Sequence, residues 1–330
     1  MKVKTYPAYF SFFTVTLMIL LIAACGYGPS PPGQAETGYG SSEKYLNSST
    51  EYELYSVGAK DDGTRAWYFL PRVLVDSSKG PVVIFLHGHT AVDYHIYMGH
   101  ITHLVRQGYI VIYPEYQFSG PSNPYDDLDQ TVMLDRAIAS VEKALEGLGG
   151  HADRNNMVLY GHSLGGLLAL CWSAEGGPAA SRVVLANANL DPSTGIPAFV
   201  LDMYEFTFLD YTSKASATTR PVIILWGDND RSMAPYDQQE DAYDLLINAA
   251  SKVIYTAQTD KHGYPPLIAD HGAAVQPYEP DGSGIEEDAL DFRYFYAALD
   301  AAIDGQNTLS FDMGSWEDGK PVKPILQTKP

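Results

Sequence analysis

One heptapeptide constrains the fold of this chain more than any other feature. Residues 160–166 are YGHSLGG, and they lie between an apolar β-rich run, Met157–Tyr160, and an apolar stretch that begins at Leu164. Glycines two residues before and two residues after Ser163 allow a sharp strand-to-helix turn. Such a turn exposes the serine hydroxyl at the carboxyl end of a sheet, beside a helix N-terminus that favours negative charge. The pattern predicts a nucleophilic Ser163 in an α/β fold.

The rest of the chain alternates between apolar, β-rich runs and amphipathic stretches. We expect strands at Thr64–Pro71, Val82–His87, Tyr109–Tyr113, Met157–Tyr160, Val183–Asn187, Val222–Trp226 and Val253–Ala257. We expect helices at Asp93–Gln107, 126–147, Leu164–Trp172, Ala242–Ala250 and Glu286–Ile303. Alternation of this kind implies parallel strands joined by right-handed crossovers. The predicted fold class is therefore α/β, a three-layer sandwich with a mostly parallel central sheet.

The N-terminus has the pattern of an export signal. Two lysines precede an apolar run, Ala8–Ala24, that is short for a membrane-spanning helix. The run ends in Ile22-Ala23-Ala24-Cys25, which resembles the bacterial lipobox. This resemblance implies a lipoprotein signal peptide over residues 1–24, lipidation of Cys25, and an exported bacterial protein held at the cell envelope by its lipid anchor alone. A plain signal peptide and a secreted product are the alternative.

Composition divides the remainder of the chain. Residues 25–50 are rich in Gly, Ser and Pro, which predicts a flexible tether. Residues 51–305 form one α/β domain, in which the aromatic segment 189–219 is too long for a simple connection and predicts a short cap or pocket wall. The tail, 306–330, is expected to pack against the body or to be loosely ordered, without chemistry.

Charge and side-chain spacing exclude several partners. The chain has 21 Lys and Arg against 40 Asp and Glu, a formal net charge of −19, and no basic cluster, which argues against nucleic acid. His100 and His103 have a spacing that could imitate a metal site, but a polar helix surface is the simpler interpretation because no metal motif is present. We predict neither a metal nor a cofactor. Cys171 is expected to be a buried core thiol.

From about residue 50 to 303 the chain resembles the α/β-hydrolase family, whose serine is followed along the chain by an acid and then a histidine. Residues 222–235, VIILWGDNDRSMAP, are similar to the segment that carries the acid after a late strand. The resemblance implies Asp230 as the acid, with Asp228 as its competitor and Asp191 as a weaker one.

The base is expected just after the last strand of the sheet. His262 follows that strand directly, whereas His271 comes nine residues later, past two prolines and an apolar stretch. A base must reach the serine hydroxyl at hydrogen-bond distance. The sequence favours His262, and His271 is the rival.

The resemblance also suggests an oxyanion hole, which needs two backbone N–H groups aimed at one oxygen. One belongs to Leu164, the residue after the nucleophile. The other comes from the sequence His87-Gly88-His89, which is similar to the H-G-x loop of esterases and of secreted cutinase-like enzymes. By this resemblance His89 supplies the second N–H, while His87 and His162 are structural.

The expected function is a serine hydrolase that cleaves small carboxylic esters through Ser163, His262, Asp230 and an acyl-enzyme intermediate. Dienelactone-hydrolase-like enzymes are also similar. This chain lacks the cysteines for the C-terminal disulfide that cutinase-like enzymes often carry, so polyester cleavage is less expected than cleavage of small or lipid-like esters. The alternatives are a peptidase or acyltransferase with the same triad, and a non-catalytic surface binding lipoprotein on a hydrolase scaffold.

Overall fold

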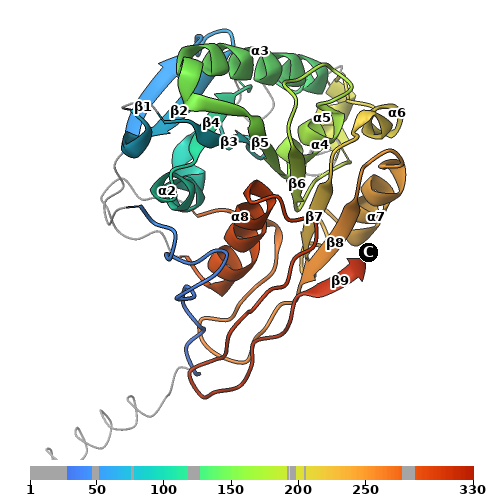
Figure 1. Cartoon of the computed structure of the whole chain (residues 1–330). Coiled ribbons are helices and arrows are strands. Elements are labelled where there is room, and N and C mark those ends of the chain that lie inside the picture. Colours follow the sequence, from blue (N-terminus) through green and yellow to red (C-terminus); the bar gives the residue numbers. More distant parts are fainter. Residues whose placement is uncertain are drawn as a thin grey trace, which may run out of the picture.

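The computed structural model describes residues 28–46, 52–75, 78–117, 127–191, 193, 198–203, 206–276 and 287–330. They form a 9-stranded sheet in the order β1-β2-β4-β3-β5-β6-β7-β8-β9 (Figure 1). The strands are β1 Tyr52–Val57, β2 Arg65–Pro71, β3 Gly80–Leu86, β4 Ile110–Glu115, β5 Ala152–His162, β6 Arg182–Ala186, β7 Val222–Gly227, β8 Lys252–Ala257 and β9 Leu326–Lys329. The pairs β1–β2, β2–β4 and β8–β9 are antiparallel, and all other neighbours are parallel. The predicted mostly parallel sheet is confirmed.

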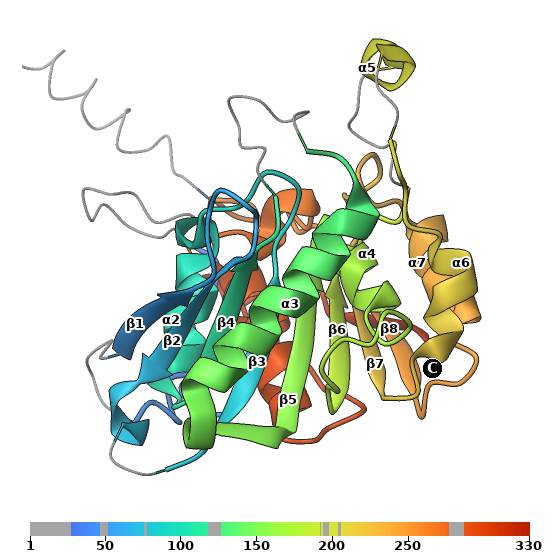
Figure 2. The same ribbon diagram turned by 90° about the horizontal axis from the view of Figure 1, so that it is seen from above.

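Helices cover both faces of the sheet, which completes the predicted three-layer sandwich (Figure 2). One core includes side chains of α3 Gln130–Leu148, α4 Leu164–Cys171 and α7 Tyr236–Leu245, and the other includes those of α2 Met98–Arg106 and α8 Ala297–Ile303. Strand β3 alternates between the two: Ile84 packs into the first core and Phe85 into the second, and both are fully buried. Burial on both faces explains why the central strands are continuous apolar runs.

Two edge strands lack a strong sequence signal and were not predicted. Strand β1 carries half-exposed Leu54 and Tyr55, and β9 is largely exposed as well. The helix expected over Ala242–Ala250 begins earlier, at Tyr236, directly after Pro235. Pro235 is the N-cap residue in an extended conformation, and the helix ends at Leu245, before the expected Ala250.

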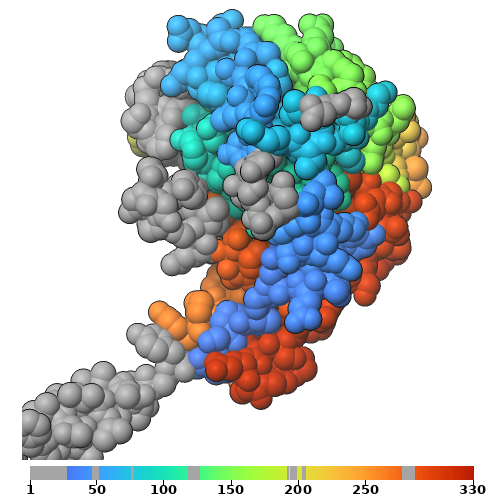
Figure 3. Space-filling model, turned by 60° about the vertical axis from the view of Figure 1, so that its left-hand side comes forward, coloured from blue at the N-terminus to red at the C-terminus, as the bar shows by residue number. Residues whose placement is uncertain are grey.

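Part of the expected tether is packed against the domain, which corrects the prediction for residues 28–46. The Tyr264 N–H donates to the Pro29 carbonyl at 3.1 Å, and the Gly40 N–H donates to the buried Asp300 carboxylate at 2.8 Å. Figure 3 shows this blue segment lying against the red C-terminal part of the chain. Backbone groups of the segment make these two contacts, and the Tyr45 hydroxyl adds a side-chain contact 2.9 Å from the His103 Nδ1.

The two ends of the chain differ in what the structure describes. The signal-peptide prediction, with Cys25, falls on residues 1–27, which lie outside the described residues. Of the helices in the described part of the chain, none combines the length and the apolar character needed to cross a bilayer. The C-terminal segment is packed: Trp316 is 1% exposed and its indole donates to the Asp260 carboxylate at 3.0 Å. Cys171 is a buried free thiol, as expected.

Candidate active site

The predicted turn at Ser163 joins β5 to α4 at the carboxyl edge of the sheet. Ser163 has φ 55° and ψ −122°, a left-handed backbone conformation that non-glycine residues rarely adopt. A Cβ on Gly161 would lie 2.2 Å from the Gly165 carbonyl oxygen, and one on Gly165 would lie 2.3 Å from the Leu86 oxygen. Both glycines are therefore required for the close approach of backbone segments that the turn needs.

A continuous hydrogen-bonded chain joins Ser163 to an acid through a histidine, and that histidine is His271. The His271 Nε2 lies 2.8 Å from the Ser163 Oγ, and the Nδ1 lies 2.6 Å from an Asp230 carboxylate oxygen. The Asp230 side chain is 1% exposed and that of His271 is 21% exposed. A carboxylate only accepts hydrogen bonds, so the Nδ1 carries the proton and the Nε2 is left to accept from the serine hydroxyl.

The expectation that His262 is the base is wrong. The His262 Nε2 lies 2.8 Å from the Asp318 carboxylate, and the Nδ1 accepts from the Lys320 ammonium at 3.1 Å. An isolated antiparallel bridge between Asp260 and Leu267 turns this stretch away from the end of β8. His262, the first histidine after β8, is thereby held against the C-terminal segment, while the chain returns to the sheet edge before His271.

The structure also separates the two candidate acids. Asp230 accepts a hydrogen bond from the Ala234 N–H at 3.1 Å through one oxygen and contacts His271 through the other. Asp228 accepts from the Thr259 N–H at 2.8 Å and thus joins the ends of β7 and β8. Asp191 accepts from Ser193 nearby, which leaves Asp230 as the acid that contacts a histidine of the site.

The loop after β3 lies against the nucleophile, as the predicted oxyanion loop requires. A Cβ on Gly88 would lie 3.3 Å from the Ser163 Cβ, so these two backbones are close neighbours. The Gln117 side chain holds the loop, because its oxygen accepts from the Thr90 N–H at 2.8 Å and its amide nitrogen lies 3.0 Å from the His89 Nδ1. Leu164 is the first residue of α4, where N–H groups have no acceptor within the helix.

Two further histidines beneath the site are structural, as predicted. The His87 Nδ1 lies 2.7 Å from the Gly88 carbonyl oxygen, and its ring stacks on Tyr116 with centroids 4.0 Å apart. The His162 Nδ1 lies 2.8 Å from the Tyr97 hydroxyl, and its Nε2 lies 2.9 Å from the His271 carbonyl oxygen. Burial lowers the pKa of both imidazoles to about 3, so both are neutral at pH 7.

Sequence reasoning did not identify three buried polar residues that contact the loops of the site. They are Tyr97, Gln117 and Asn187. None belongs to a motif, because each acts through contacts that are distant along the chain. The available signal was their position: Gln117 and Asn187 are polar residues that follow apolar strands, β4 and β6.

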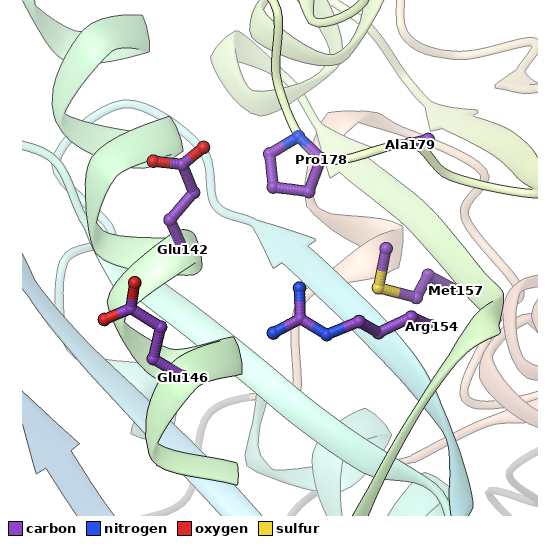
Figure 4. A pocket seen from close by; sticks show the side chains of 6 residues that line it. All are labelled: Glu142, Glu146, Arg154, Met157, Pro178 and Ala179. Carbon is purple, nitrogen blue, oxygen red and sulfur yellow. The ribbon is translucent and has the colours of Figure 1, made fainter. Parts of the chain in front are cut away.

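The described residues contain no group of metal-ligating side chains, and His103 contacts Tyr45 and Asp300 instead. A separate hollow of about 470 Å³ lies between α3 and the beginning of β5 (Figure 4). Glu142 and Glu146 face Arg154 across it, and its other lining residues are Met157, Pro178 and Ala179.

The mostly parallel sheet with helices on both faces is an α/β-hydrolase fold, and the hydrogen bonds that join Ser163 to His271 and His271 to Asp230 lie at its carboxyl edge. The sequence agrees, because the model of the alpha/beta hydrolase family matches residues 83–306, and the chain belongs to that family. Among solved structures, Pyrococcus horikoshii acylaminoacyl peptidase superposes with a TM-score of 0.50 at 17% identity, which shows the shared fold. The alignment covers 68% of this chain but only 38% of the peptidase. A search of curated protein sequences gives no match.

Proposed function

We propose that the protein cleaves carboxylic esters with Ser163 as nucleophile, His271 as general base and Asp230 as the acid that orients the imidazole. The observation that carries the proposal is the position of the His271 ring, 2.8 Å from the serine hydroxyl and 2.6 Å from the carboxylate. As the Ser163 oxygen bonds to the ester carbonyl carbon, its proton passes to the His271 Nε2. Asp230 stabilises the imidazolium that results.

The backbone N–H groups of Leu164 and His89 are proposed to hold the oxyanion. Collapse of the tetrahedral intermediate releases the alcohol, which takes the proton from His271, and leaves an acyl group on Ser163. A water molecule that gives a proton to His271 then attacks the acyl carbon, and the second collapse frees the acid and restores the serine hydroxyl. Removing one oxyanion donor typically costs about 10²–10³ in kcat.

The first test compares Ser163→Ala with Ser173→Ala, an exposed serine just after α4. The wild type and Ser173→Ala should hydrolyse p-nitrophenyl esters and react with a fluorophosphonate probe, whereas Ser163→Ala should do neither. Retention of most of the activity by Ser163→Ala refutes the assignment. A wild type that neither hydrolyses esters nor reacts with the probe favours a non-catalytic binding protein instead.

Ester chemistry is separated from peptide chemistry by paired substrates. An acyl p-nitrophenyl ester and the matching p-nitroanilide present the same acyl group with different leaving groups, and we expect turnover of the ester to dominate. A panel graded by acyl length would test the proposed pocket wall in segment 189–219, in which Phe199 is 62% exposed and Phe208 is 38% exposed. Turnover of the anilide at a rate comparable to that of the ester would assign a peptidase.

We also propose that Cys25 is lipidated and anchors the exported protein to the cell envelope. The support is the Ile22-Ala23-Ala24-Cys25 sequence after a basic and then apolar N-terminus. Metabolic labelling with palmitate should modify the wild type and not Cys25→Ala. Equal labelling of both would refute the anchor.

A further inference from the structure

The histidine of the site lies in an irregular segment, so something other than regular secondary structure must fix its direction. His271 begins a short 3-10 turn, η5 His271–Ala274, that follows β8 by more than ten residues. A side chain points where its Cα–Cβ bond points, and that direction is set by the two peptide planes that flank the Cα. In His271 those planes carry the carbonyl groups of Asp270 and of His271 itself.

Each of these two carbonyl groups accepts a hydrogen bond from a buried side chain at the end of a central strand. The Asn187 amide nitrogen, after β6, donates to the Asp270 oxygen at 2.9 Å. The His162 Nε2, at the end of β5, lies 2.9 Å from the His271 oxygen. Asn187 is fully buried and His162 is 3% exposed. Both peptide planes that flank the His271 Cα are thus attached to the rigid sheet.

The direction of every hydrogen bond on the His162 side follows from chemistry. A carbonyl only accepts, so the His162 Nε2 carries the ring proton and the Nδ1 must accept from the Tyr97 hydroxyl, 2.8 Å away. The Tyr97 oxygen in turn accepts from the Gly88 N–H at 2.9 Å. Tyr97 therefore holds His162 in the tautomer that binds the His271 backbone, and it joins this contact to the oxyanion loop.

Asn187 makes a corresponding link toward the acid. Its side-chain oxygen accepts from the Gly227 N–H at 3.0 Å, three residues before Asp230, while its nitrogen holds Asp270. This amide therefore links the loop of the acid to the loop of the histidine, beside the Asn229 N–H, which donates to the Ala269 carbonyl oxygen at 2.9 Å.

We propose that His162 and Asn187 are positioning residues that orient His271 toward Ser163 by holding its two flanking peptide planes, and that Tyr97 sets the tautomer of His162. This inference rests on the proposed function of His271 as the base. A misplacement of about 1 Å in a reacting group can cost about 10²-fold in rate. The loss falls on kcat rather than KM, because neither residue is required to contact the substrate.

The test measures kcat and KM for a p-nitrophenyl ester in His162→Leu, His162→Gln and Asn187→Asp, with thermal unfolding of each variant. His162→Leu should lower kcat about 10²-fold with KM nearly unchanged, and His162→Gln, which can still donate to the carbonyl, should recover at least about tenfold. Asn187→Asp keeps the acceptor for Gly227 but cannot donate to Asp270, and it should also lower kcat. His100→Leu is the matched control, a buried histidine whose nitrogens have no hydrogen-bond partner among the described residues, and its kcat should not change.

A second background shows whether the effect passes through His271. In His271→Ala, adding Asn187→Asp or His162→Leu should cause no further loss of the residual activity. The inference is overturned if Asn187→Asp and His162→Leu fold and each has a kcat near that of the wild type. An equal loss in both backgrounds also overturns it, because a general structural role would act without His271. Full activity in His271→Ala alone refutes the proposed function instead.

Discussion

Lowering the pH from 7 to 5 should destabilise the folded protein, because several of its histidines are buried in the neutral form. Burial lowers the pKa of His87 and of His162 from 6.5 to about 3, and it lowers that of His100 well below 6.5. The unfolded chain takes up protons at these positions near the ordinary value, whereas the folded chain does so only near pH 3. Stability is therefore complete above about pH 6.5 and is lost as the pH falls toward 3.

The size of the effect follows from the difference in pKa between the two states. One pH unit between the two pKa values corresponds to about 1.4 kcal/mol, and pH 5 lies about 1.5 units below the ordinary pKa of 6.5, so at pH 5 each of His87 and His162 reduces the free energy of unfolding by about 2 kcal/mol. Together they remove about 4 kcal/mol, a large part of the roughly 5–15 kcal/mol typical of a folded domain. His100 acts in the same direction.

His87→Asn isolates one of these contributions. The asparagine amide can donate to the Gly88 carbonyl as the His87 Nδ1 does, but it does not titrate. Urea unfolding at pH 7 and at pH 5 gives the loss of stability in each protein, and the packing cost of the substitution cancels in this difference. The loss should be about 2 kcal/mol smaller in His87→Asn than in the wild type.

Ser173→Ala is the control, since it replaces an exposed side chain that does not titrate in this range. Its acid dependence should equal that of the wild type. If His87→Asn loses as much stability between pH 7 and pH 5 as the wild type does, the imidazole of His87 is not held neutral by burial, and the reasoning fails.

Three further predictions concern other substitutions. His271→Ala should lower kcat for an ester by about 10⁴-fold or more, whereas His262→Ala should leave it unchanged; equal losses in steady-state kinetics would contradict the assignment of the base. Gly165→Ala should abolish the native fold, because its Cβ would lie 2.3 Å from a backbone oxygen of the β3 strand, and a native circular dichroism spectrum would contradict this. Asp300→Ala should cost about 3–5 kcal/mol in urea unfolding and expose the N-terminal segment to protease; an unchanged digestion pattern would oppose it.

The positions of the proposed nucleophile and the proposed acid could be predicted from the sequence because each lies in a short contiguous pattern tied to a regular strand. The turn at Ser163 needs Gly161 and Gly165, because a Cβ at either position would clash with backbone atoms. Asp230 comes three residues after the end of β7. Over such short distances the geometry of strand and turn leaves little freedom, so spacing along the chain predicts position in space.

The proposed base could not be predicted in this way, because the chain between β8 and His271 is irregular. His262 is closer to the end of the strand in sequence, but the bridge between Asp260 and Leu267 sends it toward the C-terminal segment. The path of an irregular segment depends on distant hydrogen-bond partners that sequence spacing does not encode. The same reason explains the N-terminal segment, which binds distant partners through its backbone, as at the Gly40 N–H, and through side chains such as Tyr45.

These failures and the proposed positioning of His271 have one physical cause. An irregular loop cannot place a reactive side chain unless its backbone is tied to a rigid element, and the available ties are buried polar side chains. Burying such a group is costly unless it is hydrogen-bonded, so a polar residue at the end of an apolar parallel strand implies a partner that approaches from elsewhere. Three residues occupy that kind of position: His162 is the last residue of β5, Asn187 follows β6, and Gln117 lies just after β4. Each of them holds a loop of the site. A sequence can therefore indicate where a loop is held, although only the structure shows that the loop held by His162 and Asn187 carries His271.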